Sequence, residues 1–324
     1  MSREPLPGMP LTIQFAHPVY RLAERFAPRD AGLPHFQTWD AAATRERIGE
    51  ADVLVISGLW HDALLAGAPR LRLIQTCSAG YDHFGLAALR ERGVRMANAR
   101  GVNVDAVSEH ALALMLAFTR KLHKARDHQA RAMWRGSVSE FAGREDVLGG
   151  KTLLIIGFGA IGQRLGRLAR AFGMQVIGVR REAAEGREHA DEVQAPEQLL
   201  SLLPRAHFVV LTCPLTEATR GIIGERELAA MRPDAHLINV AGGACVDQAA
   251  LLSALLSGRI AGAGLDVFAP EPLPADSPLW SLPNVIVTPH TAGDLKAYED
   301  RVIDILLENL GRLSRGEPLR NQVL

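Results

Sequence analysis

Short apolar runs alternate with longer helical patterns through most of the chain. Each run spans four or five residues and is mostly apolar rather than alternating, which is typical of strands that are covered on both faces. Amphipathic stretches such as 163–172 and 248–257 separate the runs, so the pattern predicts an α/β fold of parallel sheets with helices on both faces. The expected strands are 11–15, 53–57, 73–76, 94–97, 152–156, 175–179, 208–212, 237–240, 263–267 and 285–288.

Two breaks divide this pattern into domains. Residues 104–122 form a long, mostly apolar helical stretch, and Asn103 before it is well placed as an N-cap. After Pro289 the chain becomes helical again to about residue 313. We therefore expect one domain at 1–100 plus 290–324 and a second domain at 101–289.

Residues 124–148 do not fit the strand–helix alternation. They contain Trp134, Phe141 and many charged side chains. Two interpretations stand side by side: an arm that contacts a second copy of the chain, or a surface loop with one buried tryptophan.

Composition narrows the class of protein. The 324 residues include 36 basic and 36 acidic side chains, and a formal net charge of zero predicts no nucleic-acid partner. The longest apolar run, 111–118, is shorter than the ~18 residues of a membrane helix, and no hydrophobic signal segment opens the chain. Cys77, Cys213 and Cys245 have neither disulfide nor metal-ligand spacing. We expect a cytoplasmic protein with reduced thiols, no membrane contact and no metal site.

A glycine-rich turn joins the expected strand 152–156 to a helix. The turn reads Gly157-Phe158-Gly159-Ala160-Ile161-Gly162, which is the G-x-G-x-x-G pattern in its strand–turn–helix context. The first glycine permits the tight turn, the second lets a pyrophosphate approach the backbone, and the third allows close helix–strand packing. The helix N-terminus adds free N–H groups and a partial positive charge. The turn therefore predicts a dinucleotide-binding domain.

The end of the next strand bears on the choice of dinucleotide. NAD-binding proteins usually have an acidic residue there, but this strand ends in Arg180 and Arg181. Arginine would pair with the 2′-phosphate of NADP, although about one residue in ten of this chain is arginine. The pair favours NADP over NAD, and a solvated basic turn is the alternative.

Three further sequence segments, downstream of the glycine turn, can be compared with known protein families. They read INVAGGACVD (238–247), AGLDVFAPEPLP (263–274) and TPHTAG (288–293). Together with the glycine turn and matches at 78–94, 101–116 and 213–224, they resemble the D-isomer-specific 2-hydroxyacid dehydrogenase family over about residues 53–310. The resemblance implies two doubly wound parallel-sheet domains, with a Rossmann dinucleotide-binding domain inserted in a flavodoxin-like substrate domain.

The resemblance also implies roles for individual residues. His290 matches the family's general acid/base, and histidine suits this role because its ordinary pKa lies near neutrality. Glu271 matches the carboxylate that orients this histidine, and Asp266 matches a position beside the nicotinamide end of the cofactor. Further cofactor contacts are expected at the six residues of the glycine turn and at Arg180, Arg181, Cys213, Pro214, Val240, Ala241, His290 and Ala292.

One position departs from the family pattern. The family has an arginine that bridges the substrate carboxylate and carbonyl, in a segment of the form N-x-x-R-G, and here Gly242 follows Asn239-Val240-Ala241. Loss of its charge-assisted hydrogen bonds should lower kcat/KM at least ~10- to 150-fold. Three explanations remain open: another cation or substrate, a degenerate enzyme, or a substitution introduced into the protein.

The resemblance predicts the remaining features of the function. Backbone N–H groups of Ser78, Ala79 and Gly80 would receive the substrate carboxylate. We expect a homodimer that reduces a small 2-keto acid, such as glyoxylate or hydroxypyruvate, with NADPH favoured and NADH possible. The alternative is a dinucleotide-responsive interaction module with weak or no turnover.

Overall fold

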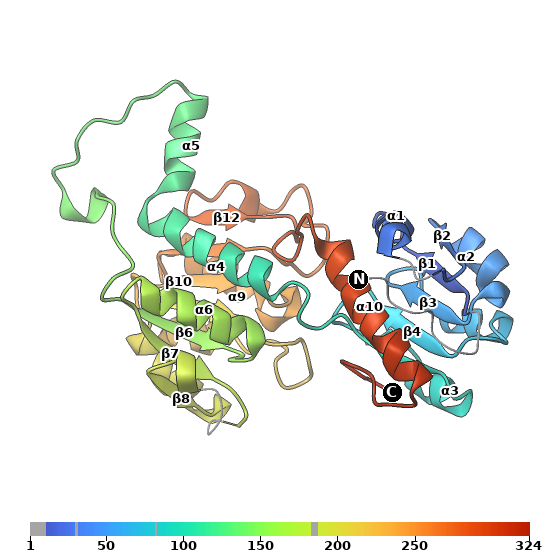
Figure 1. Ribbon diagram of the computed structural model, residues 1–324. Coiled ribbons are helices and arrows are strands. Elements are labelled where there is room, and N and C mark those ends of the chain that lie inside the picture. Colours follow the sequence, from blue (N-terminus) through green and yellow to red (C-terminus); the bar gives the residue numbers. More distant parts are fainter. Residues whose placement is uncertain (1–10, 30–31, 82, 183–186) are drawn as a thin grey trace. The chain divides into compact units, whose positions relative to one another are not determined.

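The computed structural model describes residues 11–29, 32–81, 83–182 and 187–324. The chain forms two compact units, which are labelled by element in Figure 1. Unit 1 contains the described residues up to Asn103 together with Leu295–Leu324, and unit 2 is Val104–Asp294. Residues 290–294, which we expected with the C-terminal segment, therefore pack in unit 2.

Unit 1 is built on a five-stranded parallel sheet in the order β2-β1-β3-β4-β5. This is the flavodoxin-like order. In β3, Val53 and Val55 enter one apolar cluster while Leu54 and Ile56 enter another, so both faces of the sheet are buried. The strands are β1 (Ile13–Ala16), β2 (His35–Thr38), β3 (Val53–Ile56), β4 (Leu73–Thr76) and β5 (Arg95–Ala97).

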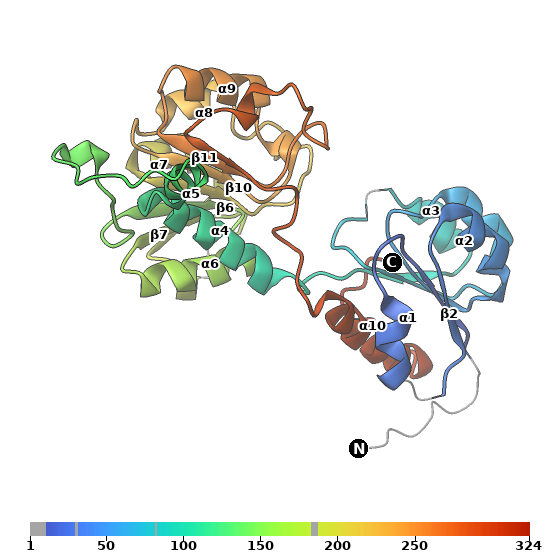
Figure 2. The ribbon, with the colours of Figure 1, turned by 90° about the horizontal axis from the view of Figure 1, so that it is seen from above.

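The C-terminal segment closes unit 1. Helix α10 (Tyr298–Ser314) lies beside α1 (Leu22–Phe26), as Figures 1 and 2 show. The buried amide of Asn309 donates to Gln75 Oε1 in β4 at 3.0 Å, which fixes α10 to the sheet. The last residues pair antiparallel with edge strand β5, so its backbone groups are covered. The other helices are α2 (Ala41–Arg47) and α3 (Leu86–Glu91).

Unit 2 is built on a seven-stranded parallel sheet in the order β12-β11-β10-β9-β6-β7-β8. The order reverses between β6 and β9, which start the two halves of the sheet. The strands are β6 (Thr152–Ile156), β7 (Gln175–Val179), β8 (Glu192–Gln194), β9 (Phe208–Leu211), β10 (His236–Asn239), β11 (Gly262–Leu265) and β12 (Val285–Val287).

Helices cover both faces of this second sheet. Figure 2 shows α8 and α9 on one side of the strands and α4 and α6 on the other, and each side has its own apolar cluster. Two α/β domains with parallel sheets confirm the predicted fold class. The helices are α4 (Val104–Thr119), α6 (Ala160–Ala171), α7 (Leu199–Leu202), α8 (Glu225–Ala230) and α9 (Gln248–Leu256).

The sequence pattern missed two strands, β2 and β8. Both lie at sheet edges, where one side of the strand has no neighbour, and both carry polar residues. The expected helix 104–122 also ends earlier, at Thr119, because Lys121 adopts a left-handed conformation with φ of 50°. A separate helix, α5 (Leu122–Ala130), follows.

Residues 122–147 are here called the arm. They consist of helix α5 and the segment that follows it, and they project from the sheet of unit 2 in Figure 1. No residue of α5 is buried. Trp134 is 97% exposed and Phe141 is 83% exposed, so the interpretation with one buried tryptophan is wrong.

Within the described ranges, no helix combines the length and apolar character needed to cross a membrane. Cys77, Cys213 and Cys245 are buried free thiols. The described side chains include no group of three or more His, Cys, Asp or Glu residues arranged to hold a metal ion.

Candidate active site

The candidate residues of unit 2 follow the carboxyl ends of its parallel strands, so they meet at one edge of the sheet. This edge is where open α/β sheets bind ligands, at the point where the strand order reverses. The glycine turn follows β6, Arg180 and Arg181 follow β7, Cys213 and Pro214 follow β9, Val240–Gly242 follow β10, Asp266 follows β11, and His290 and Ala292 follow β12.

Gly157 lies where the strand order reverses, and no side chain fits at this position. Its φ of 94° favours glycine, and a Cβ atom there would overlap the backbone of Cys213, which follows the neighbouring strand β9. Thr212 Oγ1 donates to the Gly157 carbonyl at 2.8 Å and fixes the turn. A Cβ on Gly162 would lie 2.8 Å from the same carbonyl, so α6 approaches the strand as closely as the pattern predicts.

Gly159 has open space where the other two glycines have neighbours. A Cβ there would meet no described atom within 4 Å, and Gly159 caps the N-terminus of α6. The first N–H groups of a helix, here those of Ala160 and Ile161, have no intrahelical acceptor. An open cradle above these donors fits the pyrophosphate of a dinucleotide.

Phe158 takes a different role from the cofactor contact that we expected. Its ring is buried in the core and would touch a Cβ on Gly178 of β7 at 2.5 Å. Its backbone N–H donates to the Val179 carbonyl at 2.9 Å. Phe158 therefore anchors the turn to the sheet and offers neither its ring nor its N–H to a ligand.

Arg180 and Arg181 stand where the sequence places them, directly after β7. The Arg180 N–H donates to the Gln194 carbonyl of β8 at 3.1 Å, and its side chain is half-buried. Arg181 is exposed. Both arginine side chains are therefore attached at the carboxyl end of β7, where the adenosine ribose of a dinucleotide would lie.

A pair of cysteines lies beneath the ends of β9 and β10. A hydrogen bond between the two thiols lowers the pKa of Cys245, against the effect of burial, and Thr219 and Gly242 lower it further. The same hydrogen bond and burial raise the pKa of Cys213. Both side chains are buried, so Cys213 supports the turn by packing, while its neighbour Pro214 is exposed.

The segment after β10 is ordered by Asn239. Its side chain accepts from the Ala241 N–H and donates to the Gly242 carbonyl, each at 3.1 Å. Gly242 is extended, with φ of −157°, and a Cβ there would lie 3.4 Å from Leu215 Cβ, so a larger residue fits. A Cβ on Gly243, in contrast, would overlap the carbonyl of Phe268.

His290 and Glu271 form the pair that the sequence predicts to be catalytic. His290 Nδ1 lies 2.7 Å from Glu271 Oε2, and Glu271 Oε1 accepts from the Phe268 N–H at 2.8 Å. The His290 side chain is 64% exposed and that of Glu271 is 34% exposed. With Nδ1 held by the carboxylate, Nε2 is the ring atom left to exchange a proton with a substrate.

His290 also has an uncommon backbone conformation. Its φ of 54° lies in the left-handed region, which costs a residue other than glycine of order 1–3 kcal/mol. Its N–H donates to the carbonyls of Asp266 at 2.8 Å and Thr288 at 3.0 Å, so the surrounding loop holds the conformation in place.

The Asp266 side chain holds this loop rather than a ligand. Its carboxylate is almost fully buried and accepts from Thr288 Oγ1 at 2.6 Å and from the N–H groups of Thr291 and Ala292, each at 2.9 Å. His110 Nε2 lies 3.0 Å from the same Thr288 hydroxyl. Sequence reasoning placed Asp266 beside the cofactor and did not select His110 or Thr288, since only the fold joins these segments.

In unit 1, the loop Ser78–Gly80 follows β4 and is held by its carbonyl groups. The Ser78 carbonyl accepts from the Ala99 N–H, the Ala79 carbonyl from Asn98 Nδ2, and the Gly80 carbonyl from Ser78 Oγ. No described residue accepts a hydrogen bond from the three N–H groups of this loop. Ala79 and Gly80 are exposed, so their N–H groups can meet an anion from solvent.

We expect Asp266→Asn to loosen the loop that carries His290. The amide would place a donor against the N–H of Thr291 or Ala292, and the loss of charge-assisted hydrogen bonds should lower local stability by about 2–4 kcal/mol. Hydrogen–deuterium exchange of peptides covering 285–294 in urea measures this loss. Asp247→Asn is the control, because asparagine caps helix α9 about as well as aspartate does. Equal protection in the two variants would contradict the assigned role of Asp266.

Comparisons with known proteins identify the family of the chain. Residues 112–292 match the family model described as D-isomer specific 2-hydroxyacid dehydrogenase, NAD binding domain. The chain is 36% identical to the glyoxylate reductase of Korarchaeum cryptofilum over 279 residues, which are 84% of this chain and 82% of that protein. It is 39% identical to glyoxylate/hydroxypyruvate reductase B of Pectobacterium carotovorum over 262 residues, 80% of this chain and 81% of that protein.

A solved structure extends the agreement to the whole fold. The D-isomer specific 2-hydroxyacid dehydrogenase family protein from Aeromonas salmonicida superposes with a TM-score of 0.84 and 30% identity, covering 98% of this chain and 99% of that one. The chain therefore belongs to the D-isomer specific 2-hydroxyacid dehydrogenase family and is an NAD(P)-dependent oxidoreductase of that class.

Proposed function

We propose that the protein reduces a small 2-keto acid to its D-2-hydroxy acid, with NADPH preferred over NADH. Glyoxylate and hydroxypyruvate are the first candidates. Two relatives, at 36% and 39% identity, are named glyoxylate reductase and glyoxylate/hydroxypyruvate reductase B. The observation that carries the proposal is the 2.7 Å contact between His290 and Glu271, on the sheet edge that also holds the glycine turn.

Each residue of this edge has a separate task. The open cradle at Gly159 and the N-terminus of α6 would hold the pyrophosphate. The bound dinucleotide supplies the hydride. His290 Nε2 gives a proton to the carbonyl oxygen of the substrate and takes it back in the reverse reaction. Glu271 orients the ring and stabilises its protonated form, and Asp266 fixes the backbone from which His290 projects.

We assign the substrate carboxylate to the loop Ser78–Gly80 of unit 1. The loop's carbonyl groups are already bonded within the unit, and its N–H groups are the donors that remain. Such a set of backbone N–H groups is a recurrent anion-binding arrangement.

We further propose that Gly242 stands in the place of the family's substrate-bridging arginine. Leu215, which is 41% exposed, is the side chain nearest to the absent Cβ, so this position is lined by an apolar group instead of a cation. The loop Ser78–Gly80 then becomes the principal carboxylate anchor, and turnover of simple 2-keto acids is reduced. The same feature leaves a dinucleotide-responsive interaction module as the second candidate function.

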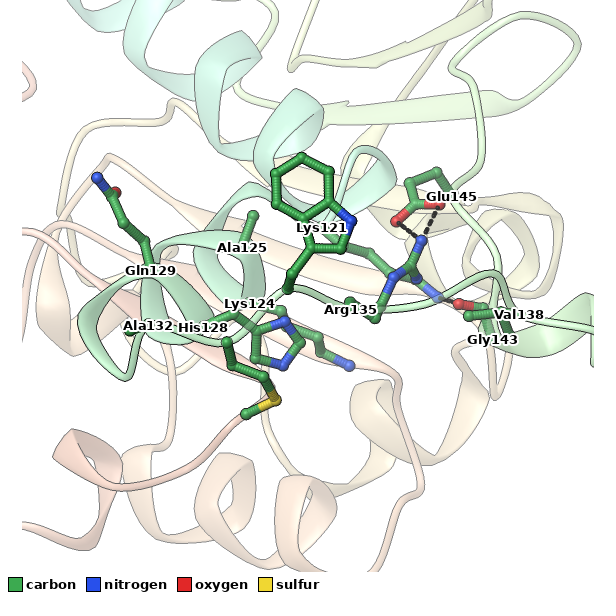
Figure 3. Close-up of a pocket in the computed structure, with 12 residues that line it drawn as sticks. Lys121, Lys124, Ala125, His128, Gln129, Ala132, Arg135, Val138, Gly143 and Glu145 are labelled. Carbon is green, nitrogen blue, oxygen red and sulfur yellow. Dashed lines mark hydrogen bonds and ion pairs between the residues drawn. The ribbon is translucent and has the colours of Figure 1, made fainter.

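The arm supports a homodimer as the working form. Besides Trp134 and Phe141, it exposes Leu122, Met133 and Val147, which a second copy of the chain would cover. The arm also lines a cavity of about 880 Å³. Figure 3 shows the residues that line it, among which Arg135 and Glu145 form an ion pair. Apolar side chains presented on an ordered arm are typical of an interface between subunits. Buried free thiols are consistent with a cytoplasmic location.

The direct test is a spectrophotometric assay with NADPH or NADH and a panel that includes glyoxylate, hydroxypyruvate and pyruvate. We expect cofactor oxidation by the wild-type protein and a 10²- to 10⁴-fold lower kcat in His290→Gln, because this change removes the general acid. Binding of NADPH, followed by fluorescence, should be the same in both proteins. Tight NADPH binding without turnover of any substrate would instead favour the interaction module.

Gly242→Arg should raise activity towards 2-keto acids. The extended backbone at residue 242 accepts a side chain, and an arginine there would add one or two charge-assisted hydrogen bonds to the substrate. We expect kcat/KM to increase ~10- to 150-fold. Gly242→Met, which adds an uncharged side chain of similar thickness, should not increase kcat/KM. Equal values in the two variants would show that the missing cation does not limit the reaction.

The choice of dinucleotide is tested by replacing Arg180 and Arg181 with glutamine. Loss of two guanidinium partners of a 2′-phosphate should weaken NADP binding by about tenfold or more, while NAD binding changes little. Isothermal titration calorimetry with each dinucleotide measures the difference. A parallel loss for NAD and NADP would overturn the assignment of these arginines to the 2′-phosphate.

A further inference from the structure

The loop Ser78–Gly80 of unit 1 is attached at its base to the C-terminal helix. Tyr298, the first residue of α10, donates from its hydroxyl to the Cys77 carbonyl at 2.7 Å. The two residues are 221 positions apart in the chain, and Tyr298 is 8% exposed. Among the described residues, no second donor reaches this carbonyl. The orientation of the Cys77–Ser78 peptide group therefore depends on one buried hydrogen bond.

The peptide group converts a hold on its carbonyl into a direction for its N–H group. A trans peptide unit is planar, so its C=O and its N–H point in opposite directions. The Cys77 carbonyl shares its plane with the Ser78 N–H, which has no acceptor in the part of the chain that the structure describes. Because Tyr298 holds the carbonyl, the N–H is turned away from α10, where a bound anion would accept from it.

The next two peptide groups of the loop are held in the same way by other segments. The Ser78 carbonyl accepts from Thr76 Oγ1 and, at 3.0 Å, from the Ala99 N–H. The Ala79 carbonyl accepts from Asn98 Nδ2 at 2.9 Å. These bonds orient the two N–H groups that follow them in the chain. The loop therefore presents three N–H groups whose directions are set through the carbonyl groups that precede them.

The three carbonyl groups differ in the number of donors that hold them. The Ser78 carbonyl has two donors, so it would keep one if the Thr76 hydroxyl were lost. The Cys77 carbonyl has Tyr298 as its single described donor. Loss of the Tyr298 hydroxyl would therefore release a peptide group, whereas loss of the Thr76 hydroxyl would not.

The Tyr298 ring is fixed by packing within unit 1. It lies against the ring of Tyr20 at 4.9 Å between centroids, and Tyr20 stacks in parallel on His17 at 4.0 Å. His17 Nδ1 accepts from the N–H groups of Val19 and Tyr20, which fixes the imidazole to the turn after β1. A phenylalanine at position 298 would keep these ring contacts and lose only the hydroxyl.

The thiol at the base of the loop is uncharged near pH 7. Burial raises the pKa of Cys77 to about 12, and the carboxylate of Glu299 acts in the same direction, while a hydrogen bond with Ser57 opposes it. The Cys77 N–H donates to Ser57 Oγ at 3.1 Å and to the Ile56 carbonyl at 3.3 Å. Cys77 is thus held at both its N–H and its carbonyl, and its side chain adds no charge that would repel a carboxylate.

We propose that Tyr298 is a positioning residue for the substrate, because its hydroxyl turns the Ser78 N–H towards the substrate carboxylate. Tyr298 acts through the Cys77 carbonyl and does not touch the substrate. The inference rests on the assignment of the substrate carboxylate to the loop Ser78–Gly80. Since the carboxylate is the same in the ground state and the transition state, Tyr298 should affect KM and leave kcat unchanged.

The test compares two variants that each lose one buried hydroxyl, Tyr298→Phe and Thr76→Val. Isothermal titration calorimetry of the full chain with saturating NADPH measures the binding of oxamate, an unreactive analogue of a small 2-keto acid. We expect Tyr298→Phe to weaken oxamate binding about tenfold, because one hydrogen bond to the charged carboxylate is misdirected. Thr76→Val should stay within twofold of the wild type, because the Ala99 N–H still holds the Ser78 carbonyl.

Steady-state kinetics with 2-keto acids give a second readout. In Tyr298→Phe, KM should rise about tenfold, while kcat and the Kd for NADPH stay within twofold of the wild-type values. A general loss of stability would not raise KM alone. Unchanged oxamate binding in Tyr298→Phe, an equal loss in Thr76→Val, or a fall in kcat at constant KM would overturn the inference.

A further variant covers the case in which Tyr298→Phe does not fold, as judged by circular dichroism. Asn98→Ala applies the same test to the Ala79 carbonyl, for which Asn98 Nδ2 is the one donor among the described residues. It should also weaken oxamate binding about tenfold, and unchanged binding would overturn the inference.

The oxamate titration needs no turnover, so it separates this inference from the proposed reaction. A wild-type protein that binds oxamate and reduces no 2-keto acid would contradict the proposed reaction alone. A wild-type protein that reduces 2-keto acids and does not bind oxamate at about 50 mM would overturn the role of Tyr298 and leave the reaction in place.

Discussion

The candidate active site depends on one buried carboxylate. Asp266 is 1% exposed, and a charge at such a position is tolerated only when hydrogen bonds replace its hydration. Three donors from residues 288–292 do so, and they give the loop after β12 a single conformation. His290 lies within that loop in a left-handed conformation that an isolated chain would rarely adopt. The position of the imidazole to which we assign the proton transfer is thus set by a residue that has no need to touch the substrate.

The parallel sheet of unit 2 brings the other candidate site residues together. Because every strand of unit 2 runs the same way, the residues after β6, β7, β9, β10, β11 and β12 converge on one edge although together they span more than 100 residues of sequence. The reversal of strand order between β6 and β9 puts Gly157 against Cys213 and leaves open space above Gly159.

Features that the sequence predicts correctly are those that depend on local patterns. Apolar runs identify the buried strands because both faces of each sheet are covered. The glycine turn can be recognised because Gly157 and Gly162 have no room for a side chain and Gly159 leaves open space above the helix N-terminus. The His290–Glu271 contact follows from the resemblance to a family, and the structure brings the two side chains together. Edge strands β2 and β8 lack a continuous apolar run, so the same reasoning cannot find them.

Other features depend on contacts between distant segments, which a single sequence does not display. Phe158 stands within a phosphate-binding pattern, yet its ring is buried because Gly178, on another strand, makes room for it. Trp134 is a large apolar residue and is nevertheless exposed.

The most direct test of the central claim is a crystal structure of the protein with NADPH and a non-reactive analogue of a 2-keto acid. We predict the pyrophosphate above Gly159, the Asp266 carboxylate still bonded to the N–H groups of Thr291 and Ala292, and His290 Nε2 within about 3 Å of the analogue's carbonyl oxygen. A structure in which Asp266 leaves that loop to bind the cofactor, or in which His290 faces away from the analogue, would contradict it.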